Sequence, residues 1–186
     1  MKRAFAILMI MVLFAGCSRE NEAIEKVIDL RERILSSNGT SFSAVITADY
    51  EDALYTFQLD CTFDTEGNLS FTVKEPASIC DITGTVSKDR QMLTFDDKVL
   101  AFPPLADGQL SPVMAPYIFL SSLKGGYISA CSEEEEGYCI YLDDSFQENQ
   151  LHLQIFTDAE CIPVRAEITY CNLRILTIDV SNFMVL

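Results

Sequence analysis

The feature that most constrains the fold is an alternation of apolar and polar residues that returns along most of the chain. From position 42 to 50 every second residue is apolar or aromatic, and positions 55–63 repeat the pattern after an acidic turn, Glu51-Asp52. Because successive side chains of a β-strand point to opposite faces of a sheet, each run predicts a strand with one buried face. A third run at 69–73 follows the turn 64–68. These runs, joined by short turns, predict an antiparallel meander.

Further runs of the same kind predict seven more strands. They lie near 79–87, 91–95, 127–131, 138–142, 151–156, 164–170 and 175–183.

Two segments depart from the period of two. Between Asn21 and Leu35 the apolar residues follow helical spacing, which predicts one amphipathic helix. In the proline-rich stretch that follows the first meander, Ser111-Pro112 and Gly125-Gly126 are start and stop signals of a second helix, and Pro116 should break that helix or delay its start. We therefore predict an α+β fold with a strongly curved antiparallel sheet.

The N-terminus has the layout of an export signal. Lys2 and Arg3 precede an apolar run from Ala4 to Ala15, which is too short for a membrane span, since a spanning helix needs about 20 residues. The segment Leu13-Phe14-Ala15-Gly16-Cys17 resembles the lipobox of bacterial lipoprotein precursors, although Phe14 stands where Leu is usual.

That resemblance implies that residues 1–16 are a signal peptide and that Cys17 becomes an acylated N-terminus, carrying fatty acids such as palmitate. Residues 17–22 would then be a lipidated polar spacer, and 23–186 a single domain. Two or more acyl chains anchor a protein stably to a membrane. An ordinary cleaved signal, with Cys17 as a structural cysteine, and a retained N-terminal anchor are the alternatives.

The charge of the chain limits its partners. The sequence has 13 basic and 28 acidic residues, and removal of Lys2 and Arg3 with the signal leaves 11 − 28 = −17. Nucleic acid is therefore not an expected partner, because a phosphate backbone is bound by a basic face. The same charge argues that the acyl anchor, and not a charged protein surface, would hold the molecule at an anionic membrane.

Six cysteines remain besides Cys17, and an exported chain permits disulfides. They stand at 61, 80, 131, 139, 161 and 171, without C-x-x-C spacing, and the chain has a single histidine, so no metal site is expected. Cys131 and Cys139 flank a predicted turn and form the candidate disulfide. Free buried thiols that behave as small apolar residues are the alternative.

The sequence contains no recognisable catalytic constellation. His152 is the only histidine, and no G-x-S-x-G elbow presents a serine to it. Glu133 to Glu136 lack the spacing of a calcium loop and are typical of a solvated turn. With no glycine-rich phosphate loop, we expect no enzyme and no cofactor.

The apolar face of the predicted sheet is rich in aromatic residues. A face of this kind is either a filled core or an incompletely filled pocket that takes a hydrophobic ligand. Its members are Phe42, Tyr50, Tyr55, Phe57, Phe63, Phe71 and Phe95.

The order of these elements resembles a known superfamily. A lipobox, a helix, a meander with an F-x-V-x-x-P-x-x-I motif from Phe71 to Ile79, a proline-rich helical insertion and a last meander with Cys161-Ile-Pro-Val-Arg165 follow one another. The chain resembles the LolA/LolB-like lipoprotein-sorting superfamily, and within it the spore-germination lipoproteins of the GerS type.

The resemblance implies an open antiparallel half-barrel whose concave face is covered by the N-terminal helix and the central helical insertion. In carriers the cavity receives acyl chains, which makes Phe57, Phe71, Met114 and Phe119 the candidate ligand-binding residues. Germination-type members resemble protein-interaction scaffolds with a filled core. Carriers are soluble, so the Cys17 anchor departs from them. The arginine that controls the carriers' lid has no expected counterpart here, since the first strands contain no Arg.

The expected location is the extracytoplasmic face of the cell membrane. The expected partners are the membrane itself, through acylated Cys17, a lipid or acyl chain, and a protein.

Overall fold

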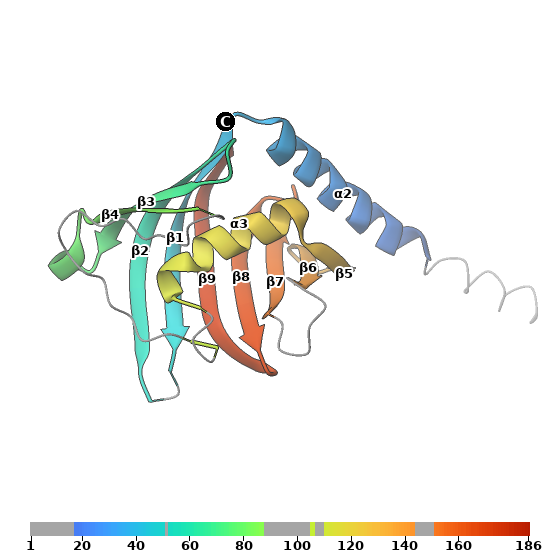
Figure 1. The fold of residues 1–186 in the computed structure, drawn as a ribbon. Coiled ribbons are helices and arrows are strands. Elements are labelled where there is room, and N and C mark those ends of the chain that lie inside the picture. The colour runs from blue at the N-terminus through green and yellow to red at the C-terminus, as the bar shows by residue number, and fades with distance from the viewer. Residues whose placement is uncertain (1–16, 51, 88–104, 107–109, 144–150) are drawn as a thin grey trace, which may run out of the picture.

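The described part of the chain forms one antiparallel sheet with two helices. The computed structural model describes residues 17–50, 52–87, 105–106, 110–143 and 151–186. Within these residues nine strands are hydrogen-bonded in the order β4-β3-β2-β1-β9-β8-β7-β6-β5 (Figure 1). The strands are β1 (Gly39–Asp49), β2 (Leu54–Asp64), β3 (Leu69–Glu75), β4 (Thr83–Val86), β5 (Tyr127–Glu133), β6 (Gly137–Asp143), β7 (Leu151–Asp158), β8 (Pro163–Tyr170) and β9 (Leu173–Val185).

The sheet consists of two meanders that join at its centre. Each strand pairs with its neighbour in sequence within 39–86 and within 127–185, and β1 then pairs with β9 in a register that sets Ile46 opposite Ile178. The chain therefore enters and leaves the sheet at the same place. There the Asn38 amide donates to the Leu186 carbonyl at 2.9 Å, and the Leu186 amide donates to the Gly39 carbonyl at 2.9 Å.

The two faces of the sheet differ as the alternation predicts. Ile46, Leu59, Ile155 and Ile168 on one face are completely buried in a single apolar core. The other face is polar. There the Oγ1 atoms of Thr47 on β1 and Thr56 on β2 lie 3.2 Å apart.

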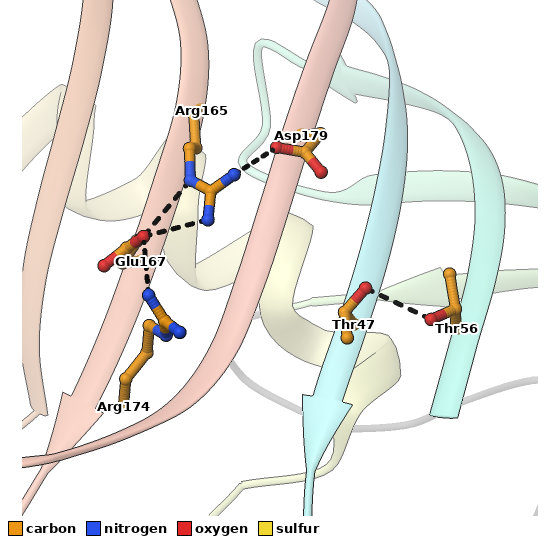
Figure 2. A network of polar contacts seen from close by, with 6 residues as sticks. All are labelled: Thr47, Thr56, Arg165, Glu167, Arg174 and Asp179. Carbon is orange, nitrogen blue, oxygen red and sulfur yellow. Dashed lines mark hydrogen bonds and ion pairs between the residues drawn. The ribbon is translucent and has the colours of Figure 1, made fainter. Parts of the chain in front are cut away.

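A small charged network continues this polar face on β8 and β9. Figure 2 shows Arg165 between Glu167 and Asp179, at 3.0 and 3.1 Å, and Arg174 on the same Glu167 oxygen at 3.2 Å. Exposed pairs of this kind each stabilise a fold by about 1 kcal/mol or less.

The helices lie on the apolar side of the sheet. Figure 1 shows α3 (Ala115–Gly125) lying across one face of the curved sheet, while α2 (Cys17–Ser36) runs beside it and contacts β5 and α3. Two short 3-10 turns, η1 (Ala77–Ile79) and η2 (Pro112–Met114), complete the elements.

Pro116 acts on α3 as its position predicts. The chain first makes η2, and the α-helix begins only at Ala115, with Pro116 in its first turn. A proline is tolerated there because the amides of the first turn have no partner within the helix. Ser111 precedes η2, but its side chain makes no capping hydrogen bond.

Other boundaries differ from the prediction. Helix α2 begins at Cys17 instead of Asn21, so the expected spacer is helical. The run at 79–87 contains the end of η1 and then β4. Tyr55, predicted on the apolar face, is 46% exposed near the start of β2. The predicted strand at 91–95, with Phe95, lies outside the described residues.

Gly84 provides a test of how the edge of this core is packed. A Cβ built on Gly84 of β4 would lie 2.5 Å from Cζ of Phe71, the residue opposite it on β3. The Phe71 ring therefore covers the glycine. We expect Gly84→Val to lower the free energy of unfolding by about 1–3 kcal/mol through overpacking, measured by urea denaturation.

Thr83→Val on the exposed side of the same strand is the matched control and should change stability by less than about 0.5 kcal/mol. Equal unfolding midpoints for Gly84→Val and Thr83→Val would contradict this packing.

Candidate functional site

The candidate site is the concave apolar face of the sheet beneath α3. The structure brings the four predicted ligand-binding residues, from four different elements, into or against one core. Phe57 on β2, Phe71 on β3 and Phe119 on α3 are 2%, 3% and 0% exposed, and Met114 in η2 is partly buried against the same cluster.

Helix α3 is seated in this face by aromatic contacts. The Phe119 ring meets the Phe42 ring edge-on, and the two ring centroids are 5.6 Å apart. The ring centroids of Tyr117 and Phe63 are 5.9 Å apart. Edge-on aromatic pairs add about 0.5–1.5 kcal/mol to the effect of burial. Because Phe119, Leu120 and Leu123 are completely buried, α3 fills the concave face at these positions instead of roofing an open space.

Arg31 of α2 holds the C-terminal end of α3. Its Nε donates to the Leu123 carbonyl at 2.7 Å, and its Nη2 donates to the carbonyls of Gly126 at 2.6 Å and Ser122 at 3.3 Å. The last carbonyls of a helix lack partners within the helix and carry the negative end of its dipole, so a cation is favoured there. Partial burial lowers the pKa of the guanidinium, but an arginine remains protonated at neutral pH.

Arg31 is the functional candidate that the sequence analysis missed. The first strands contain no arginine, and the arginine that contacts the central helical insertion belongs to the preceding helix. A weak signal was present: Arg31 stands one turn after Val27 and one turn before Ile34, next to the buried stripe of α2.

A second polar contact fastens α2 to the sheet. Lys26 Nζ donates to Tyr138 Oη at 2.6 Å and lies 4.9 Å from the centre of that ring. The hydrogen bond to Tyr138 raises the pKa of the Lys26 ammonium, so it stays charged. Together with the apolar residues beneath them, Lys26 and Arg31 fix α2 against β6 and α3.

Two of the surface hollows lined by described residues measure about 440 Å³ or more. One, of about 440 Å³, lies over β2, β3 and β4 and is lined mainly by threonines with Asp60 and Ser70. The other, of about 660 Å³, is lined by Glu134 to Glu136 and Asp158, with Phe156 and Val164 as its apolar part. Neither of these two hollows is lined by the residues of α3.

The predicted Cys131–Cys139 disulfide does not form, and both thiols are free. Cys131 on β5 lies opposite Ile140 and belongs to the core, whereas Cys139 on β6 lies opposite Ser132. Residues that face each other across two strands share a side of the sheet, so the two cysteines point to opposite sides. The six cysteines from Cys61 to Cys171 are all free.

The residues examined for catalysis lie apart from this site. His152 Nδ1 is 2.7 Å from Asp143 Oδ1 on the polar face, where the His152 side chain is 47% exposed. The glutamates 133–136 lie in and around the turn between β5 and β6, as predicted. Among the described residues no three His, Cys, Asp or Glu side chains are grouped to hold a metal ion. Nor is any helix in that part of the chain both long and apolar enough to span a membrane.

Comparisons with known proteins find remote structural likenesses only. No protein-family model matches the sequence, and no curated protein matches it. Among solved structures, a conserved protein from Thermus thermophilus aligns with a TM-score of 0.44 and 11% identity, covering 88% of this chain and 87% of the other.

A DUF1329 family protein from Desulfovibrio piger aligns with a TM-score of 0.40 and 10% identity, over 90% of this chain and 93% of the other. A LolA superfamily protein from Nitrosomonas europaea gives 0.41 and 8%, over 88% and 93%. Likenesses at this level do not transfer a function from one protein to another.

The thiols give a direct test of the register of β5 and β6. Burial raises the pKa of the Cys131 thiol to about 11 and raises that of Cys61 further, so little thiolate is present at pH 8. With Ellman's reagent at pH 8 we expect exposed Cys171 to react in the folded protein and Cys61 and Cys131 to react only after unfolding. Raising the pH should speed the reaction of Cys131 only as pH 11 is approached.

Cys171→Ser should remove the fast phase. After unfolding without reductant, the chain from residue 18 onward should titrate as six thiols. A count of four, with the disulfide mapped to Cys131 and Cys139 by peptide mass spectrometry, would contradict the register.

Proposed function

We propose that this chain is a non-enzymatic bacterial lipoprotein of the extracytoplasmic face of the cell membrane, anchored through acylated Cys17. Its concave face would receive a hydrophobic ligand, such as the acyl chain of a lipid or of a client lipoprotein, when α3 moves aside. One observation carries the proposal. Among the described residues, the short helix α3 covers the concave face with Phe119, Leu120 and Leu123, and the Arg31 side chain of α2 holds its C-terminal end.

The free energy gained by burying the α3 side chains and that gained by burying an acyl chain in their place are of similar size. Burial of Phe119, Leu120 and Leu123 stabilises the closed form by about 1.5–3 kcal/mol for each side chain. An acyl chain gains about 0.8 kcal/mol for each buried CH₂ group, so roughly ten such groups can replace the helix. A long acyl chain is therefore a chemically suitable occupant, whereas a small apolar molecule is not.

A protein-interaction scaffold with a filled core, of the kind implied by the GerS-type resemblance, is the second candidate. Complete burial of Phe119 favours it, because a core that stays filled leaves no room for a ligand. The hollow lined by Glu134 to Glu136, Phe156 and Val164 would then be a contact surface for a basic partner.

The two candidates are separated by releasing α3. Arg31→Met leaves the Leu123 and Gly126 carbonyls without this donor, whereas the Ser122 carbonyl keeps the Gly126 amide, and we expect the change to weaken the closed form by about 1–3 kcal/mol. If α3 must move for a ligand to enter, the variant should bind a fluorescent fatty-acid analogue about 5–100 times more tightly than the unchanged protein, as measured by fluorescence titration.

Arg33→Met, which removes an exposed arginine two positions along the same helix, is the control and should bind as the unchanged protein does. Circular dichroism checks that both variants remain folded. Absence of binding in the unchanged protein and in folded Arg31→Met would contradict the ligand proposal and favour the scaffold.

Anchoring is tested at Cys17 itself. Cys17→Ala removes the thiol that would be acylated, so we expect the protein to lose incorporation of a labelled palmitate analogue and to leave the membrane fraction. Cys171→Ala, which changes an exposed cysteine far along the chain, should keep both properties. Unchanged membrane association and labelling in Cys17→Ala would show that another segment is responsible.

A further inference from the structure

Helix α2 carries two apolar stripes, and only one of them is buried. Ala23, Val27, Leu30 and Ile34 are at most 3% exposed and face the core. A second stripe, one position further along the chain, consists of Ile24, Ile28 and Leu35, which are 37%, 45% and 61% exposed. Since each residue of an α-helix turns the direction by about 100°, the exposed stripe lies roughly a quarter-turn from the buried one.

The exposed stripe lies on the same face of α2 as position 17, the site of the proposed anchor. Helix α2 begins at Cys17, and the steps from 17 to 24, from 24 to 28 and from 28 to 35 are seven, four and seven residues. Such steps return to the same face of a helix with 3.6 residues per turn. The helix is continuous from position 17. An acyl anchor on Cys17 would therefore be about 16 Å from Ile28, measured along the helix axis.

Most of the acidic residues of α2 lie away from this face. Glu22, Glu25, Asp29 and Glu32 form a separate row whose centre is about 100° from that of the stripe, and the remaining acidic residue, Glu20, stands one turn before Ile24 at the end beside Cys17. Arg31, which falls within the stripe, is occupied by the carbonyls of α3. In a chain with so many acidic residues, the stripe is an apolar sector of α2 that can approach lipid without bringing the acidic row to it.

We propose that Ile24, Ile28 and Leu35 lie in the interfacial region of the lipid bilayer and hold α2 flat on the membrane. This inference rests on the proposed anchoring at Cys17. Three partly exposed side chains bind a bilayer weakly by themselves, but an attached anchor converts that contact into an intramolecular one. The result is one fixed orientation of the domain on the membrane.

The absence of tryptophan from the sequence makes a sharp test possible. Ile28→Trp places a single tryptophan in the stripe, and Glu25→Trp places one in the acidic row as the matched control. The acylated full-length products are purified and reconstituted into vesicles of phosphatidylcholine with brominated acyl chains. Bromine quenches tryptophan at short range, so we expect the emission of Ile28→Trp to fall at least two-fold while that of Glu25→Trp is unchanged.

Flotation of the vesicles separates this inference from the anchor on which it rests. Protein that does not float with vesicles would overturn the proposed anchoring. Protein that floats while Ile28→Trp is quenched no more than Glu25→Trp would overturn the orientation and leave the anchor intact. A dimer seen by sedimentation, together with unquenched Ile28→Trp, would show that a second copy covers the stripe and would equally overturn the proposal.

Discussion

The concave face of the sheet is apolar along most of its strands, and the rest of the structure depends on keeping that face from water. A curved sheet with one apolar face is not stable alone in water, because its buried surface must be matched by another layer. Helix α3 supplies part of that layer with the large, completely buried side chains of Phe119, Leu120 and Leu123. The short helix is then held at its end by α2, so the N-terminal helix, the insertion and the sheet form one connected core.

Arg31 connects α3 to the helix that carries the proposed anchor. It belongs to the helix that begins at Cys17, and it binds the carbonyls at the end of the helix that fills the site. A change in the position of α2 on a membrane would therefore act on α3 through a side chain with two short hydrogen bonds. The proposed ligand site and the proposed membrane contact are linked by a single physical element.

Much of the sheet could be predicted because alternation is a local property. A strand with one buried face shows it in its own residues, and Pro116 marks the start of α3 in the same local way. The absence of the Cys131–Cys139 disulfide could not be predicted in this manner. The turn that places Glu133 opposite Tyr138 also sets Cys131 opposite Ile140, and a register different by one residue would have exchanged the faces. Arg31 escaped prediction because its partners are backbone carbonyls more than ninety residues away, and its place beside the buried stripe of α2 does not identify them.

Because β1 pairs with β9 at the centre of the sheet, the sheet cannot form completely until the last strand has been made. Ile46 and Ile178 are opposite one another although 178 − 46 = 132 residues separate them, so β1 is made early and waits for the last strand. Contacts between such distant residues form slowly, since a long loop must close before they are gained. Until then, both edges that later meet at the centre of the sheet are open to other chains. A chain of this topology therefore exposes the edge of its first meander until β9 has been made, and truncation within β9 would leave that meander with a permanently unpaired edge.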